Sequence, residues 1–135
     1  MTKTKSFTHN PIQVNTYLIY DETKECIIID PACYNKSEKN ELSDFISENR
    51  LIPVKIINTH GHFDHITGNK YLAEKYNIDI CINNNDLELY KNSKQSAMLF
   101  GIEFDAWVNK SMLMNGLFVN DVLCEVILFV CVFLS

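Results

Sequence analysis

The stretch Thr59-His60-Gly61-His62-Phe63-Asp64-His65 follows directly on the apolar run Val54-Lys55-Ile56-Ile57-Asn58 and guides the interpretation of the whole chain. Three of the four histidines fall within six residues here, with a carboxylate among them. Neutral imidazoles and carboxylates are common ligands of zinc and iron. A strand followed by a tight loop would present these groups from one rigid support. The pattern predicts a metal site made of His60, His62, Asp64 and His65, with a solvated histidine loop as the alternative.

The composition is that of a globular protein with one domain. The chain has 135 residues, of which 47% are hydrophobic, and this is enough to bury a single core. The net charge of -5 argues against a nucleic-acid partner, because such a partner is usually bound by a basic face.

Cysteine usage and the N-terminus indicate a cytoplasmic location. The five cysteines are odd in number and form no Cys-x-x-Cys pair, so neither a disulfide framework nor a zinc knuckle is predicted. Reduced thiols suit the cytoplasm. The lysines near the N-terminus are not followed by an apolar stretch, so we do not expect a secretory signal there.

The first half of the chain alternates between strand and helix patterns. Residues 14–20 and 26–29 predict a hairpin, and the nearly all-apolar second strand indicates burial on both faces. Asn35 and Glu38 resemble a capping box that begins a helix over 36–49, with Leu42, Phe45 and Ile46 on one stripe. A further buried strand over 54–58 would complete a βαβ unit with parallel pairing.

After the histidine loop the alternation continues. We expect a helix over 68–76 with Leu72 and Tyr76 facing inward. We also expect a strand over 78–82 with one face more exposed to water than the other. Residues 83–85 predict a turn, and residues 86–100 predict one more helix. The fold class is therefore α/β (α+β), with a mixed sheet and flanking helices.

The character of the sequence changes near Trp107. Residues 107–120 have no clean period, whereas residues 122–134 are almost wholly apolar. A membrane span needs about 20 apolar residues, and the uninterrupted run from 126 to 134 has nine. We expect a buried strand there, with a tail anchor as the alternative. The predicted organisation is a domain over 1–105 followed by a divergent apolar tail over 106–135.

Four motifs occur in an order that resembles a known family. They are Val14-Asn15-Thr16-Tyr17-Leu18, Ile28-Ile29-Asp30-Pro31, the histidine loop and Ile66-Thr67-Gly68-Asn69. Together they resemble the metallo-β-lactamase-fold hydrolases and, within these, the glyoxalase II-like (hydroxyacylglutathione hydrolase-like) branch. The resemblance extends from residue 7 to about 105. It implies part of an αββα sandwich with a two-metal site at the edge of the sheets.

The resemblance also implies roles for individual residues. His60 and His62 would bind the first metal ion, and Asp64 and His65 the second. Asp30 would orient the loop from the end of a neighbouring strand. The metals would be two zinc ions, with iron or manganese possible, and a water bound to them would have its pKa lowered to about 7. Asp64 would be the catalytic residue that steers this nucleophile or takes its proton.

The sequence departs from the family pattern after the loop. A complete site would need two further histidines and a bridging aspartate, yet no histidine follows His65. Asp121, within Phe118-Val119-Asn120-Asp121-Val122-Leu123, faintly resembles the bridging aspartate, although a surface or turn aspartate is the alternative. We therefore expect the N-terminal half of a hydrolase, truncated and joined to a tail of unrelated sequence.

Three functions remain open at this point. The first is metal-dependent hydrolysis of a small-molecule thioester such as an acyl-glutathione, impaired by the missing ligands. The second is a non-catalytic fragment that binds metal weakly, and the third is a small membrane-associated protein that uses residues 117–134 as an anchor. We expect His9 to be a surface or capping residue, and Phe100, Phe104 and Trp107 to belong to the core or its edge rather than to a substrate platform.

Overall fold

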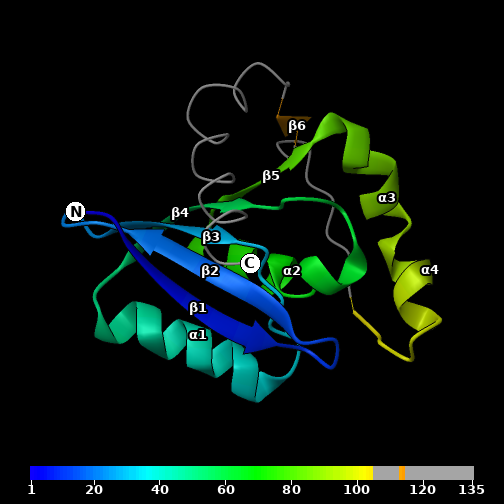
Figure 1. Ribbon diagram of the computed structural model, residues 1–135, viewed down its shortest axis with the longest axis horizontal. Helices are drawn as coiled ribbons and strands as arrows, with labels where there is room; N and C mark the ends of the chain where they lie inside the picture. Colours follow the sequence, from blue (N-terminus) through cyan, green and yellow to red (C-terminus); the bar gives the residue numbers. More distant parts are fainter. Residues whose placement is uncertain (105–112, 115–135) are drawn as a thin grey trace.

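The computed structural model describes residues 1–104, 113 and 114, which form a mixed sheet with helices packed against it (Figure 1). The strands lie in the order β1-β2-β3-β4-β5-β6. Their bounds are β1 Lys3–His9, β2 Val14–Tyr20, β3 Glu25–Ile29, β4 Ile52–Ile57, β5 Asp79–Asn83 and β6 Leu113–Met114. Strands β1, β2 and β3 pair antiparallel, and the pairs from β3 to β6 are parallel. The predicted α+β class with a mixed sheet is confirmed.

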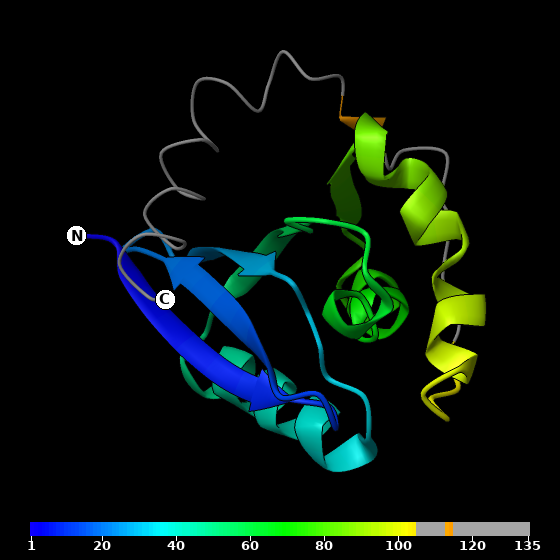
Figure 2. The ribbon, with the colours of Figure 1, turned by 45° about the vertical axis from the view of Figure 1, so that its right-hand side comes forward.

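Within the described residues, four α-helices and two short 3₁₀ turns accompany the sheet. Their bounds are α1 Lys36–Glu48, η1 Phe63–His65, α2 Asn69–Tyr76, η2 Asn84–Asp86, α3 Leu87–Lys91 and α4 Ser93–Met98. Helices α1 and α2 lie along the sheet, whereas α3 and α4 lie beyond α2 (Figure 2). The histidine loop connects β4 to α2 and includes η1.

The main core lies between one face of the sheet and helices α1 and α2. It contains Ile28 of β3 and Ile56 of β4, which are fully buried, together with Leu42 of α1 and Leu72 of α2. The predicted inward direction of Leu42 and Leu72 is confirmed. Tyr76 packs against the same core while remaining partly exposed.

The other face of the sheet is also apolar. Ile29, Ile57 and Cys81 form a second buried cluster there, with Tyr17 and Ile27 packed against it. Both faces of β3 are therefore lined with apolar side chains, as its continuous apolar sequence predicts.

On β5, the face that carries Asp79 and Asn83 is more exposed than the face that carries Ile80 and Ile82, as predicted. Cys81, between Asp79 and Asn83, is only 5% exposed. This cysteine behaves as a small hydrophobic residue.

Helix α1 begins at the predicted capping box. The Asn35 side chain accepts a hydrogen bond from the Glu38 backbone N–H, and the Glu38 carboxylate accepts one from the Asn35 N–H. These bonds satisfy donors that the first helical turn leaves unpaired. The helix then leads to β4, which pairs parallel to β3, so the predicted βαβ unit is confirmed.

The first strand and His9 differ from the prediction. β1 was not anticipated, because its sequence is mostly polar and all of it except Phe7 and His9 is exposed. His9 is 1% exposed, so the assignment of a surface or capping role was wrong. Its Nε2 lies 2.9 Å from the Glu41 carboxylate and its ring stacks on Phe7. A carboxylate from α1 makes burial of this imidazole possible, and no local pattern reveals that partner.

The predicted helix over 86–100 is interrupted. Helices α3 and α4 meet at Asn92, whose backbone angles (φ -88°, ψ 1°) end the first helix. Asparagine is unfavourable in the interior of a helix, because its side chain can hydrogen-bond to nearby backbone groups in non-helical conformations. This explains the break at Asn92. The predicted turn before it is confirmed, because the Asn83 side chain accepts a hydrogen bond from the Asn85 N–H.

Several predictions concern residues that the structure does not describe. They are the proposed strand over 122–134, the candidate ligand Asp121, Trp107 and most of the predicted tail over 106–135. Within the part of the chain that is described, no helix combines the length and the apolar character that a membrane crossing requires.

Two isoleucines of β4 provide a test of the core. Ile56 is fully buried between the sheet and the helices, whereas Ile52 on the same strand is 57% exposed. Ile56→Ala should lower the free energy of unfolding by about 2–5 kcal/mol, since it leaves a cavity. Ile52→Ala should change it by no more than about 0.5 kcal/mol. Urea unfolding followed by circular dichroism measures both, and equal effects would contradict this assignment of the core.

Candidate metal centre

The histidine loop begins where two parallel strands end. Ile29 of β3 pairs with Ile57 of β4, and the Asp30 N–H donates a hydrogen bond of 3.0 Å to the Ile57 carbonyl. Because parallel strands have their carboxyl ends at the same edge of the sheet, Asp30 and Thr59 come out side by side. This edge is where ligand sites form in open α/β sheets.

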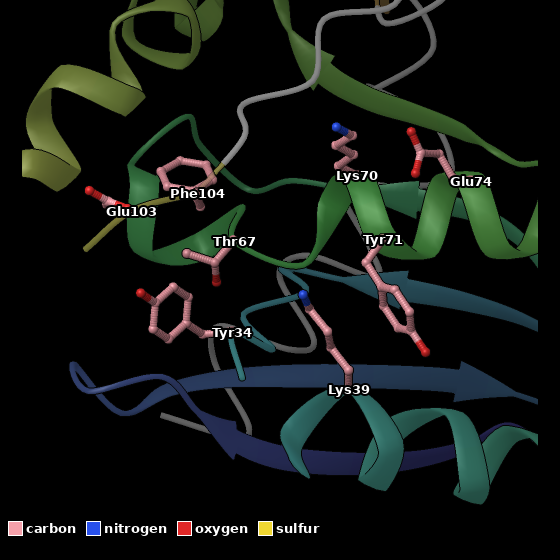
Figure 3. Close-up of a pocket in the computed structure, with 8 residues that line it drawn as sticks. All are labelled: Tyr34, Lys39, Thr67, Lys70, Tyr71, Glu74, Glu103 and Phe104. Carbon is pink, nitrogen blue, oxygen red and sulfur yellow. The ribbon is translucent and has the colours of Figure 1, made fainter. Parts of the chain in front are cut away.

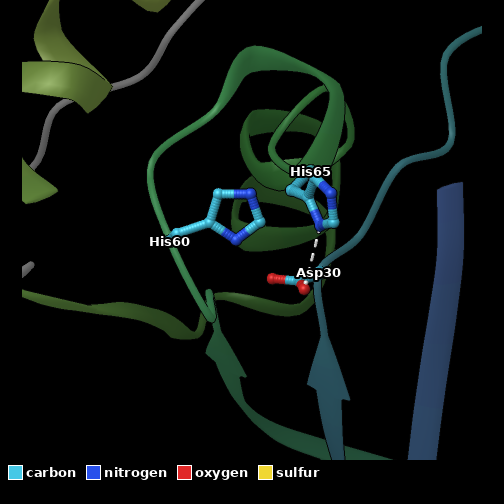
Figure 4. Close-up of side chains that lie close together, drawn as sticks. All are labelled: Asp30, His60 and His65. Carbon is cyan, nitrogen blue, oxygen red and sulfur yellow. Dashed lines mark hydrogen bonds and ion pairs between the residues drawn. The ribbon is translucent and has the colours of Figure 1, made fainter. Parts of the chain in front are cut away.

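Asp30 is a buried carboxylate that binds the loop at three points. It is 5% exposed and has a left-handed backbone conformation, with φ of 48°. Its Oδ1 accepts a 2.8 Å hydrogen bond from the Thr59 N–H, and its Oδ2 accepts one of 2.6 Å from the Thr59 hydroxyl. His65 Nδ1 lies 3.0 Å from the same Oδ2 (Figure 4). The carboxylate therefore fixes both the start and the end of the loop.

These contacts determine the tautomers of two imidazoles. Since Nδ1 of His65 faces a carboxylate, it carries the proton. The Thr59 hydroxyl donates to Asp30, so it accepts the proton of His60 Nδ1, which lies 2.9 Å away. In its neutral form, each ring thus has its lone pair on Nε2. Metal-binding histidines in proteins commonly have this arrangement, with the second nitrogen bonded to a carboxylate or another acceptor.

The candidate ligands gather in a small volume. One ligand atom from each of Asp30, His60 and His65 lies within 4.8 Å of the others. The ring centres of His60 and His65 are 4.1 Å apart, and those of His60 and His62 are 4.6 Å apart. Asp64 Oδ2 lies 3.6 Å from His65 Nε2. This donor set suits a divalent metal such as zinc or iron.

The four predicted site residues are neighbours on the loop, but they do not form one equally close group. His60 lies beside His62 and His65, and Asp64 lies beside His65. Among the described residues, the group of donors within 4.8 Å of one another consists of Asp30, His60 and His65 and does not include His62 or Asp64. Thr59 was missed by the sequence analysis, although it bonds to Asp30 and faces His60. The signal in the sequence was a hydroxyl side chain two residues after a buried strand.

The two central histidines have opposite shifts in pKa. Burial, with the neighbouring His65, lowers the pKa of His60. Burial alone would also lower the pKa of His65, but its hydrogen bond to Asp30 and the charges of Asp30 and Asp64 raise it overall. His60 is therefore neutral at neutral pH, the form in which an imidazole binds metal.

Two glycines allow the loop to approach its neighbours closely. A Cβ atom on Gly61 would lie 2.8 Å from the Asp86 carbonyl oxygen and 2.9 Å from the Tyr90 backbone nitrogen, next to α3. A Cβ atom on Gly68 would lie 2.5 Å from Cys33 Sγ and 3.0 Å from the Pro31 carbonyl oxygen. Each position excludes a side chain, so both flanks of the loop are set by backbone contact.

A pocket of about 290 Å³ lies apart from these donors (Figure 3). It opens between α1 and α2, and its lining includes Tyr34, Lys39, Thr67, Tyr71 and Phe104. None of the predicted metal ligands lines it. The candidate chemistry therefore lies at the end of the sheet and not in this pocket.

The sequence of this chain matches a model of a known protein family. Residues 9–111 match the model described as the metallo-beta-lactamase superfamily. The chain belongs to the metallo-β-lactamase superfamily. The predicted family resemblance is thereby confirmed, and with it the assignment of the chain to a superfamily of hydrolases.

Two curated relatives are identical to this chain at about a third of the aligned positions. The probable metallo-hydrolase YqgX of Bacillus subtilis is 34% identical over 98 residues, which are 71% of this chain and 44% of the relative. Hydroxyacylglutathione hydrolase GloC of Haemophilus influenzae is 30% identical over 105 residues, 73% of this chain and 48% of that protein. The chain thus spans about half the length of these two relatives.

Two solved structures have a fold similar to that of this chain. The di-iron-bound form of TTHA1623 superposes with a TM-score of 0.72 and 25% identity, over 82% of this chain and 54% of that one. The B3 metallo-beta-lactamase BLEG-1 gives a TM-score of 0.69 at 23% identity, over 84% of this chain and 54% of that one. The described residues therefore form part of the metallo-β-lactamase fold.

The contact at Gly68 provides a test of the loop. Gly68→Ala should lower the free energy of unfolding by about 1–3 kcal/mol, because the new methyl group overlaps Cys33 Sγ and the Pro31 carbonyl. Adding Cys33→Ala should restore part of that loss, since it removes the nearer atom. Urea unfolding of both single variants and the double variant measures this coupling. Additive effects, or a fully stable Gly68→Ala, would contradict the proposed contact.

Proposed function

We propose that this chain carries the metal-binding half of a glyoxalase II-type hydrolase that cleaves small-molecule thioesters. The observation that carries the proposal is the pair of imidazoles, His60 and His65, whose Nδ1 atoms are bonded within the protein and whose Nε2 atoms are available. Several relatives are named hydroxyacylglutathione hydrolase, which supports a glutathione thioester as the substrate.

The ligand assignment in this proposal follows the loop. His60 and His62 would hold one metal ion, and Asp64 with His65 a second. Zinc suits these donors, and the di-iron-bound structural neighbour makes iron an equal candidate. A divalent metal held by these residues would supply an acidic water molecule as the nucleophile near neutral pH and would polarise the substrate carbonyl.

The protein groups around the site would each have a defined task. The Asp30 carboxylate holds the His65 imidazole by Nδ1 and the Thr59 backbone by its N–H, so the ligands need little rearrangement. Asp30 acts through these contacts and is a positioning residue. Asp64 has a carboxylate beside the ligands, where it can orient the nucleophile or accept its proton.

A second candidate is a non-catalytic metal-binding fragment. The sequence observation that favours it is the lack of any histidine after His65. Within this chain, additional ligands would have to be carboxylates, thiols or main-chain groups. A site with fewer imidazoles would bind zinc more weakly and could leave the nucleophile poorly placed.

Metal binding can be measured separately from turnover. The wild-type chain, freed of metal and then exposed to zinc, should retain the ion after desalting, as measured by mass spectrometry. His60→Ala should lower its zinc affinity at least about 10-fold, because a direct ligand is lost. His9→Gln is the matched control, since His9 lies outside the cluster and glutamine can still reach Glu41. Equal zinc binding by all three chains would exclude a site on the loop.

Thioester hydrolysis tests the proposed reaction. Zinc-loaded or iron-loaded wild-type protein should hydrolyse S-lactoylglutathione, and His60→Ala should be at least about 10-fold slower. The His9→Gln variant again serves as the control. A chain that binds metal tightly yet shows no hydrolysis above the His60→Ala level would reject catalysis and leave the metal-binding fragment.

A further inference from the structure

Two buried asparagines from distant parts of the chain hold consecutive carbonyl groups of the histidine loop. Asn10 Nδ2 donates a 2.7 Å hydrogen bond to the Asp64 carbonyl, and Asn58 Nδ2 donates one of 3.2 Å to the His65 carbonyl. Asn10 is 7% exposed and Asn58 is 4% exposed. The backbone of the Asp64–His65 pair is therefore anchored from both sides.

Asn10 is itself rigidly fixed. Its backbone is left-handed, with φ of 56°, and its N–H donates a 2.8 Å hydrogen bond to the carboxylate of Glu38, which belongs to the capping box of α1. Its Oδ1 accepts a hydrogen bond from the Ile12 N–H, and its Nδ2 also reaches the Ala32 carbonyl. The turn between β1 and β2, the start of α1 and the histidine loop are thus joined through one residue.

Asn58 is fixed by a second network. Its Oδ1 accepts a 2.7 Å hydrogen bond from Asn69 Nδ2, while its own Nδ2 lies 3.3 Å from Asn69 Oδ1. Asn69 also donates to the Tyr90 hydroxyl. The Asn58 backbone N–H donates to the Cys81 carbonyl of β5. The amide orientation that satisfies these contacts is the one that directs an N–H at His65.

The loop needs this support because its own hydrogen bonds are few. The 3₁₀ turn η1 has three residues, and its internal bonds run from His65 N–H to His62 and from Ile66 N–H to Phe63. A turn of this length has little intrinsic stability. The direction of the Asp64 and His65 side chains depends on the backbone at these two residues, which the asparagines hold.

We propose that Asn10 and Asn58 are positioning residues that fix Asp64 and His65 and so set the affinity of this pair for a metal ion. The proposal rests on the proposed function for its metal step. Residues that orient metal ligands typically change metal affinity 10–100-fold when they are mutated, and we expect a loss in this range. Leucine is the most informative replacement, since its side chain has the same branching and the same number of heavy atoms as asparagine and lacks the N–H donor.

The experiment compares Asn10→Leu and Asn58→Leu with Asn49→Leu. Asn49 is a matched control, because its Nδ2 also donates to a backbone carbonyl, that of Phe45, at the far end of α1. Zinc affinity is measured by competition with a chromogenic chelator, below the unfolding temperature of every variant. In metal-free protein, hydrogen exchange measures the protection of the His65 and Ile66 amides.

The proposal expects faster exchange at His65 and Ile66 and a 10–100-fold weaker zinc affinity in the Asn10 and Asn58 variants, with neither change in Asn49→Leu. Faster exchange with unchanged zinc affinity would overturn it, as would unchanged exchange. If wild-type protein binds no zinc, the proposed function fails, and the exchange data then decide alone whether the asparagines hold the pair.

Discussion

The arrangement of the candidate site depends on one buried carboxylate. Asp30 accepts hydrogen bonds from the Thr59 backbone, the Thr59 hydroxyl and the His65 ring. A buried charge is costly unless it is paired and hydrogen-bonded, and here every partner belongs to the histidine loop. Hydrogen bonds to a charged group contribute about 1.5–3 kcal/mol each, so the loop and the carboxylate stabilise one another. The same contacts select the tautomers that leave both Nε2 atoms available.

The fold creates this arrangement through the parallel pairing of β3 and β4. Asp30 follows directly on β3, and Thr59 lies two residues beyond β4. Their separation in the sequence is large, yet the register of Ile29 with Ile57 brings them together at one edge of the sheet. Backbone hydrogen bonds hold this register, and they continue past the end of β3 in the bond from the Asp30 N–H to the Ile57 carbonyl. Core packing and site geometry are therefore consequences of the same strand pairing.

Much of the fold could be predicted because its signals are local. The capping box at Asn35 and the β-branched strand over 14–20 need only neighbouring residues for their interpretation. The burial of His9 could not be predicted, since its partner Glu41 lies on another element. The same reason applies to Thr59 and Asn10, whose importance depends on contacts with Asp30 and Asp64. The histidine loop was identified from spacing alone, but its hydrogen-bond partners required the tertiary structure.

The most direct test of this account is the structure of the zinc-loaded protein, with the metal located by anomalous diffraction at the zinc edge. The account predicts one zinc ion on Nε2 of His60, shared with His62, and a second on Nε2 of His65, shared with Asp64. The Asp30 carboxylate should still be bonded to Thr59 and to His65 Nδ1. Zinc bound through either Nδ1, zinc bound directly by Asp30 after loss of these contacts, or zinc bound away from the loop would contradict it.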